Sequence, residues 1–194
     1  MSWNRRRVLR AGGALAGVSA AALLMGTARG HAPAAAQKLH NRDAAGGKRI
    51  ALLNLHTDEK LEIEYSHDGA YVPEALSAIE GVLRDFRTGA RHVIDPHLLD
   101  YLVDVAHTVG SDPVFSVISG YRSPQTNAGL REKSTGVAQH SLHMEGRAID
   151  VRMNGIDCAN LAAHAEDLKR GGVGYYRASN FVHLDTGAFR IWKG

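Results

Sequence analysis

His143 and Asp150 stand seven positions apart in the stretch 139–151, and both residue types can bind a metal ion. An imidazole nitrogen with a carboxylate oxygen is a mixed donor set that suits a catalytic zinc ion with one coordination position left for water. A third ligand has to come from elsewhere in the chain, and His183 is the candidate. A histidine and an aspartate at this distance also occur by chance in many soluble domains. No fixed ligand spacing like that of a zinc finger is present to make the pair more specific. The spacing alone therefore leaves metal binding as one of two interpretations.

The sequence around these candidates predicts two strands that would carry them. Residues 146–153 read as an alternating strand, so that His143 lies in the loop before it and Asp150 lies on it. Residues 173–185 predict a hairpin whose second arm places the third candidate ligand and Asp185 on one face. That face could hold a metal ligand beside a carboxylate that handles protons. The alternative is a strand edge with two exposed polar residues.

The remaining chain predicts an α+β domain. Residues 50–56 and 60–65 flank a short turn, and the second run alternates apolar with charged residues, which predicts a β-hairpin with one solvated face. Residues 114–119 predict a core strand, and Arg122 follows its end, where the strand holds a side chain and the loop exposes it. A surface arginine on a turn is the alternative. Residues 134–138 predict a flexible lead into the metal motif. Helices are expected at residues 73–88, 95–110, 124–133 and 157–170.

Residues 1–36 resemble a twin-arginine export signal. The pair Arg5-Arg6 precedes an uncharged run of small and apolar residues at 11–25. This run of 15 residues is shorter than the roughly 20 that a spanning helix needs, so no stable transmembrane anchor is expected. Residues 37–48 are polar and small and predict a flexible tether, and the domain is expected at 49–194. Export by the twin-arginine machinery would place the mature protein in the periplasm.

Removal of the signal changes the charge of the chain. The full sequence carries a net charge of +3, but residues 1–36 contain five arginines and no acidic residue, which leaves 18 basic residues against 20 acidic ones. Cleavage is expected after Ala36, with Gly30 as the alternative. No basic face remains for nucleic acid, so this class of partner is not expected. Cys158 is the single cysteine and can form no internal disulfide.

The order of the motifs resembles the M15 zinc peptidases, and in particular their branch of twin-arginine-exported murein endopeptidases. Residues 119–123 precede the metal motif as they do in that family, and the resemblance extends from about Arg49 to Trp192. The motif consists of Ser141, His143, Gly146, Ala148 and Asp150, followed by Val182, His183, Leu184 and Asp185. The resemblance implies the LAS/hedgehog-type zinc peptidase fold, an α+β fold in which helices flank a small antiparallel sheet that carries the zinc site.

The resemblance also implies roles for individual residues. Zinc would be held by His143, Asp150 and His183, with Arg122 near the substrate carbonyl or carboxylate and Ser141 supporting the first ligand. The implied substrate is a peptidoglycan stem peptide, and the family branch favours endopeptidase cleavage of cross-links between stem peptides over carboxypeptidase activity, D,D or L,D.

One position departs from the family pattern. Many M15 peptidases carry an acidic general base three residues before the third zinc ligand, and here that position is Asn180. The HxH arrangement of related enzymes is absent too, because Phe181 stands two residues before His183. Asp185 is therefore expected to act as the base or to orient a ligand, with His140 and Glu145 as substitutes. The missing acid also supports a rival hypothesis, a zinc-stabilised peptidoglycan-binding module with little or no catalysis.

Overall fold

The computed structural model describes residues 46–133 and 137–194. The expected signal at 1–36, most of the expected tether and residues 134–136 of the expected flexible lead lie outside this part of the chain. The described strands are β1 (Lys48–Asn54), β2 (Lys60–His67), β3 (Ala70–Tyr71), β4 (Val114–Ser119), β5 (Ala148–Met153), β6 (Gly172–Tyr176), β7 (Phe181–Asp185) and β8 (Arg190–Lys193). The described helices are α2 (Pro73–Val82), α3 (Pro96–Thr108), α4 (Pro124–Lys133), α5 (Cys158–Leu168) and the short 3-10 helix η1 (Leu142–Glu145).

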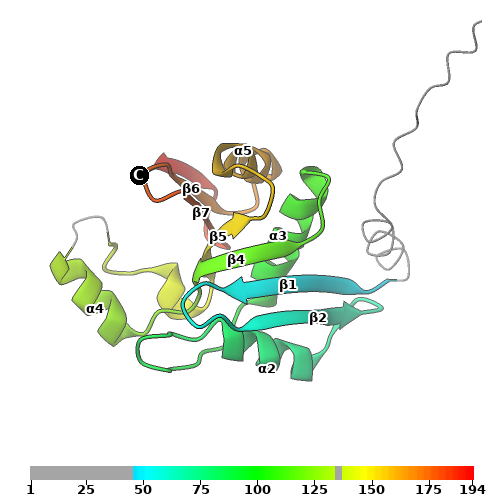
Figure 1. Cartoon of the computed structure of the whole chain (residues 1–194), viewed down its shortest axis with the longest axis horizontal. Helices are drawn as coiled ribbons and strands as arrows, with labels where there is room; N and C mark the ends of the chain where they lie inside the picture. The colour runs from blue at the N-terminus through cyan, green and yellow to red at the C-terminus, as the bar shows by residue number, and fades with distance from the viewer. Residues whose placement is uncertain (1–45, 134–136) are drawn as a thin grey trace, which may run out of the picture. The chain divides into compact units, whose positions relative to one another are not determined.

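The strands form one mixed sheet of eight strands in the order β3-β2-β1-β4-β5-β7-β6-β8 (Figure 1). The predicted α+β class is confirmed, but the prediction of a small antiparallel sheet is wrong. β1 pairs in parallel with β4, and β6 pairs in parallel with β8, while the other neighbours are antiparallel. The β1–β4 pairing joins the N-terminal hairpin to the later strands across a long connection. Local sequence patterns do not report pairings between such distant segments.

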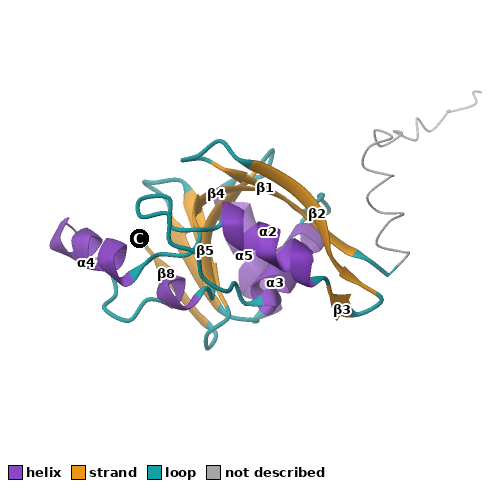
Figure 2. Cartoon of the chain, turned by 90° about the horizontal axis from the view of Figure 1, so that it is seen from below, coloured by secondary structure: helices purple, strands orange, loops and turns teal. Residues whose placement is uncertain are grey.

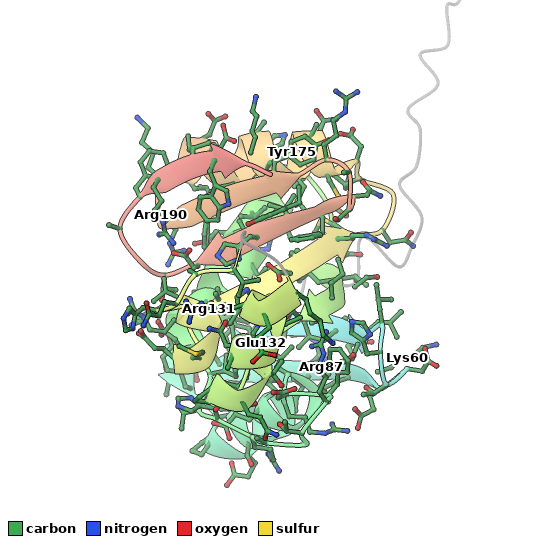
Figure 3. The ribbon with its side chains drawn as sticks, turned by 90° about the vertical axis from the view of Figure 1, so that its left-hand side faces the viewer. Lys60, Arg87, Arg131, Glu132, Tyr175 and Arg190 are labelled. Carbon is green, nitrogen blue, oxygen red and sulfur yellow. The ribbon has the colours of Figure 1, made fainter. Side chains whose placement is uncertain are left out.

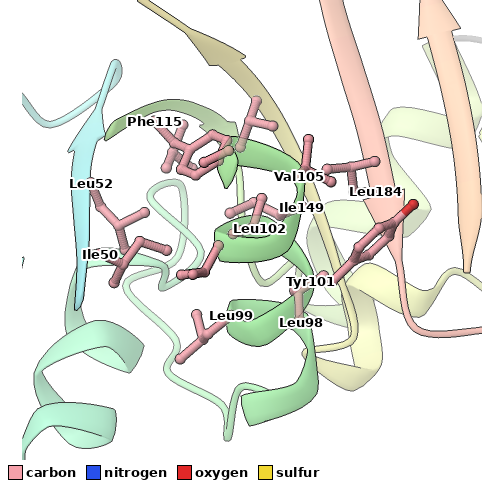
Figure 4. Packing of buried hydrophobic residues seen from close by; sticks show 14 of the residues in the cluster. Ile50, Leu52, Leu98, Leu99, Tyr101, Leu102, Val105, Phe115, Ile149 and Leu184 are labelled. Atoms are coloured by element: carbon pink, nitrogen blue, oxygen red, sulfur yellow. The ribbon is translucent and has the colours of Figure 1, made fainter. Parts of the chain in front are cut away.

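One face of the sheet packs against helices, and the other carries polar side chains. Helices α2, α3 and α5 lie together against one face, and α4 stands away from them (Figures 1 and 2). Between these helices and the sheet lies the hydrophobic core, in which Leu102 of α3 packs near Phe115 of β4 and Ile149 of β5 (Figure 4). Each of these side chains is fully buried, and burial of one such side chain contributes roughly 1.5–3 kcal/mol. Alternate residues on β5 and β7 point to the opposite face, where polar side chains gather.

The helices begin as predicted, but α2 ends six residues early. Its predicted range reached residue 88, whereas the helix stops at Val82 because other elements bind its last carbonyl groups. The Asn54 side-chain amide donates to the Val82 carbonyl at 2.8 Å, and the Tyr121 amide donates to the Leu83 carbonyl at 2.8 Å. These tertiary hydrogen bonds replace the next helical turn.

The other helix starts agree with the capping signals in the sequence. Asp95 accepts a hydrogen bond from the His97 amide at the start of α3, and Asp157 accepts one from the Asn160 amide at the start of α5. No helix in the described parts of the chain is both long enough and apolar enough to cross a membrane.

Candidate metal centre

The three predicted ligands lie together on the polar face of the sheet. Asp150 on β5 and His183 on β7 are direct partners across the two strands, and η1 carries His143 beside them. The Nε2 atom of His143 is 3.2 Å from Nδ1 of His183 and 3.3 Å from Oδ1 of Asp150, and the latter two atoms are 2.9 Å apart. All three residues are 2–9% exposed. Two nitrogens and one oxygen therefore converge on a single buried point.

Hydrogen bonds to the outer ring nitrogens determine which nitrogen of each histidine faces this point. Nδ1 of His143 lies 2.8 Å from the Gly120 carbonyl, which can only accept, so this nitrogen carries the proton. Nε2 of His183 lies 2.9 Å from Oδ2 of Asp185, which favours a proton there. Each inward nitrogen, Nε2 of His143 and Nδ1 of His183, then presents a lone pair, and both face Oδ1 of Asp150. Three acceptors so close together repel one another unless a cation lies between them, so the residues present fit a metal ion.

Electrostatics around the cluster agree with that interpretation. Burial lowers the pKa of His143. Burial alone would raise the pKa of Asp150, but the neighbouring His143 and His183 hold it well below its usual range. The pKa of His183 is raised, because hydrogen bonds to the carboxylates of Asp150 and Asp185 outweigh the effect of burial.

Asp185 is fully buried and its carboxylate is surrounded by donors. Oδ1 accepts hydrogen bonds from the amides of Gly172 and Gly187, and the Arg190 guanidinium binds both oxygens. Despite burial, the donors from His183, Arg190 and Gly187 hold the pKa of Asp185 well below its usual range. A carboxylate so occupied is poorly suited to take a proton from water, and its geometry favours the second predicted role, orientation of His183.

Arg122 lies beside the cluster, on the loop after β4. One of its terminal nitrogens is 3.7 Å from Oδ2 of Asp150, and its backbone amide donates to the His143 carbonyl at 3.1 Å. The buried Nε atom of Arg122 has no hydrogen-bond partner. The side chain is thus largely desolvated, only loosely paired, and available to a substrate oxygen.

A buried carboxylate anchors the loop that carries Arg122. Oδ2 of Asp85 accepts hydrogen bonds from the amide and the hydroxyl of Ser123 at 2.9 and 2.6 Å, and Oδ1 accepts from the Arg87 amide. Burial raises the pKa of Asp85, but these hydrogen bonds and one from Thr126 hold it well below the usual range. No local sequence pattern singles out Asp85, because its partner Ser123 lies 38 residues further along the chain.

Two glycines of the motif are required by the local geometry. Gly146 ends η1 with a φ of +66°, in the left-handed region, and a Cβ at this position would collide with the Val93 carbonyl. A Cβ on Gly120 would come within 2.6 Å of the Leu83 carbonyl. Ser141 is buried directly before η1, and its main-chain carbonyl accepts a hydrogen bond from the Met144 amide. These residues shape the turn that presents His143.

The remaining candidates lie in different surroundings. His140 is exposed before η1, and the exposed Glu145 pairs with Arg147 at 3.1 Å. Asn180 lies in the exposed turn between β6 and β7 with a φ of +51°, a conformation that asparagine tolerates better than most residues. Phe181 follows it and stacks on Tyr176 with ring centroids 4.5 Å apart. Position 180 thus serves the turn.

The sequence did not single out the residues of β8 that reach the site. Arg190 binds Asp185, and the Trp192 ring lies 5.1 Å from the His183 ring. Both side chains arrive through the parallel pairing of β8 with β6, for which the short strand contains no local signal. Figure 3 views the molecule from the side towards which α4 projects, with Arg190 labelled among the strands and Arg131 and Glu132 on α4.

A His, Asp and His cluster on a sheet, with oriented rings and an adjacent arginine, is a site of the kind found in mononuclear metallohydrolases. The family model for peptidoglycan L,D-endopeptidase MepK, a family of M15 peptidases, matches residues 42–192. The chain belongs to this family, and the resemblance predicted from its motifs is confirmed.

Individual relatives match over most of the chain. The peptidoglycan L,D-endopeptidase MepK of Escherichia coli (strain K12) is 39% identical over 189 residues, which cover 97% of each protein. The probable peptidoglycan L,D-endopeptidase MepK of Haemophilus influenzae is 40% identical over 146 residues, which cover 75% of this chain and 78% of the relative. No solved structure gives a significant match.

Proposed function

We propose that the protein is a zinc-dependent murein endopeptidase that hydrolyses amide bonds in the peptide cross-links of peptidoglycan. The observation that carries the proposal is the convergence of His143, Asp150 and His183, whose donor atoms lie within 4.8 Å of one another with both rings oriented from outside. Three protein ligands, two imidazole nitrogens and one carboxylate oxygen, would be the donor set of a catalytic rather than a structural zinc site. The family membership supports the same activity.

The residues around this centre would have different roles in the reaction. A zinc ion bound there would polarise a substrate carbonyl and make a nearby water molecule more acidic. Arg122 would place a fixed positive charge where the negative charge of the tetrahedral transition state develops, an effect that can amount to about 3–4 kcal/mol. Asp185 would hold the ring of His183 and keep its proton on Nε2. Oδ1 of Asp150 would be the ligand atom, while its Oδ2 faces the Arg122 guanidinium.

The bond cleaved is proposed from the relatives. Their names describe L,D-endopeptidases of peptidoglycan, and we infer the same bond for this chain. We further propose that residues 1–36 form a twin-arginine signal that is removed on export, that residues 37–48 tether the domain, and that the enzyme works in the periplasm. Contact with peptidoglycan requires export from the cytoplasm, and residues 1–36 would supply the signal for it.

The experiment is a digestion of intact cross-linked murein by the purified protein with and without zinc, followed by mass spectrometry of the muropeptides. Conversion of dimeric into monomeric muropeptides is expected with zinc and not after treatment with a chelator. His143→Ala serves as the matched control, since it removes one ligand and leaves Arg122 in place. Binding of murein without conversion of dimers under any metal would favour the binding module. Release of terminal residues from monomers alone would favour a carboxypeptidase.

A further inference from the structure

The C-terminal strand β8 touches the third candidate ligand in two ways, directly through Trp192 and indirectly through Arg190. We propose that Arg190 is a positioning residue for the metal centre, which acts through Asp185 to fix the ring of His183. The inference rests on the proposed metal site but concerns a residue outside the expected ligand set. Its basis is the geometry of the contacts.

Arg190 meets Asp185 as a two-pronged donor. Its Nη1 atom is 3.0 Å from Oδ1, and its Nη2 atom is 2.6 Å from Oδ2. A planar guanidinium that binds both oxygens fixes the plane of the carboxylate, which a single ammonium cannot do. With this plane fixed, Oδ2 faces Nε2 of His183 at 2.9 Å. The amides of Gly172 and Gly187 hold Oδ1 alone, so Arg190 is the donor that also fixes Oδ2 and, through it, the direction of the Nδ1 lone pair of His183.

The neighbouring side chain on the same strand face restricts the ring from another direction. The rings of Trp192 and His183 are inclined at 53° with centroids 5.1 Å apart, and the Arg190 guanidinium lies 5.0 Å from the Trp192 ring centroid. Trp192 is held in turn by a hydrogen bond from its Nε1 to the Tyr176 hydroxyl at 3.0 Å. The strand thus contacts His183 at its ring and at its hydrogen-bonded edge.

The sequence of β6 accommodates these side chains. A Cβ on Gly174 would come within 2.5 Å of the Trp192 ring, and a Cβ on Gly172 would come within 2.6 Å of Nη1 of Arg190. The side chains of Arg190 and Trp192 therefore pass over the two glycines of β6 to reach β7. The arginine side chain is 47% exposed while the carboxylate it binds is fully buried, so the charge reaches the site from the surface.

The test compares Arg190→Gln and Arg190→Lys with Lys193→Gln, a control on the same strand. Zinc affinity is measured by competition with a fluorescent chelator, and the tautomer of His183 is measured by long-range ¹⁵N–¹H NMR of the metal-free protein at alkaline pH. Arg190→Gln is expected to weaken zinc binding, by less than the roughly 10–100-fold that loss of the direct partner Asp185 would cost, and to abolish the single Nε2–H tautomer. Arg190→Lys should recover part of the affinity, and Lys193→Gln should match the wild type.

Thermal unfolding of the metal-free variants separates positioning from a merely structural role. An Arg190→Gln protein that is less stable but binds zinc as tightly as the wild type, with its tautomer unchanged, overturns the inference. If this variant does not fold, Arg190→Lys decides, because wild-type affinity and tautomer in that protein also overturn it. A wild-type protein that binds no zinc contradicts the proposed function instead, and the tautomer measurement then still tests the role of Arg190.

Discussion

At the scale of single residues, the site is determined by what lies behind each histidine. His143 donates its outer proton to a neutral main-chain carbonyl, whereas His183 donates to the buried carboxylate of Asp185. A carboxylate partner makes an imidazole more basic and a better ligand than a carbonyl partner does. His183 is therefore expected to be the stronger metal ligand of the two.

The first prediction concerns Asp185→Asn. The variant loses the carboxylate that accepts from both His183 and Arg190, so zinc affinity and peptidase activity should fall together, with affinity about 10–100-fold weaker. Zinc content after dialysis and the rate of muropeptide conversion measure the two effects. A variant that keeps full zinc content but loses its activity would show instead that Asp185 is the general base.

The three candidate ligands could be predicted because several motifs in the right order resemble those of a zinc peptidase family, whereas the spacing of His143 and Asp150 alone left metal binding open. The sequence could not decide the role of Asp185, since this depends on the donors around the carboxylate. Those donors are the Arg190 side chain on β8, the Gly172 amide on β6 and the Gly187 amide in the turn before β8. Only the three-dimensional arrangement brings them to one buried point.

At the scale of elements, the end of α2 and the start of the loop after β4 support each other. The Leu83 carbonyl accepts from the Tyr121 amide, and Asp85 binds Ser123 on the other side of Arg122. Gly120 lies in this contact with no room for a side chain. The helix terminus thus determines where Arg122 emerges relative to the candidate ligands.

The second prediction compares two glycine substitutions. Gly120→Ala should destabilise the protein by about 1–3 kcal/mol, because its Cβ would overlap the Leu83 carbonyl and force the two segments apart. Gly129→Ala in α4 is the control, since no atom lies within 4 Å of its Cβ, and alanine should be neutral or stabilising by about 0.5–1 kcal/mol. Urea unfolding of both variants measures the difference. Equal stability of the two would contradict the tight contact at Gly120.

Most elements were predictable because their signals are local. Helix starts were marked by Asp95 and Asp157, and each hairpin by alternation in the strand that follows its turn. The early end of α2 was not predictable, because its apolar pattern continues to Phe86 while distant groups bind its last carbonyls. The parallel pairings were missed for the same reason, since each joins segments that carry no mutual signal in the sequence.

At the scale of the whole molecule, one buried carboxylate connects the edge of the sheet to its helical layer. Asp100 on α3 accepts hydrogen bonds from Lys48 on β1, Tyr65 on β2 and Tyr71 on β3. Burial alone would raise the pKa of Asp100, but these donors, led by Lys48, hold it below its ordinary value. The ionised Asp100 thus joins the first three strands to α3, although it lies far from them in the sequence.

The third prediction concerns acid stability. Because the pKa of Asp100 is lower in the folded than in the unfolded protein, its ionised form stabilises the fold above the unfolded pKa, and this contribution is lost as the pH falls through the folded value. Asp100→Asn should lower the unfolding free energy by about 1–3 kcal/mol at neutral pH and make stability less dependent on pH below about pH 4. Urea midpoints measured with a chelator present test this. Parallel pH profiles for wild type and variant would contradict it.

The alternation of β7 has a consequence for changes in chain length. Val182 and Leu184 enter the core while His183 and Asp185 face the site, so one inserted residue within the strand would exchange the two sets and lose both together. The exposed turn at residues 177–180 can take up an extra residue without moving this frame. Core and site occupy alternate positions of the same strand, so β7 can vary in composition at single positions but not in length.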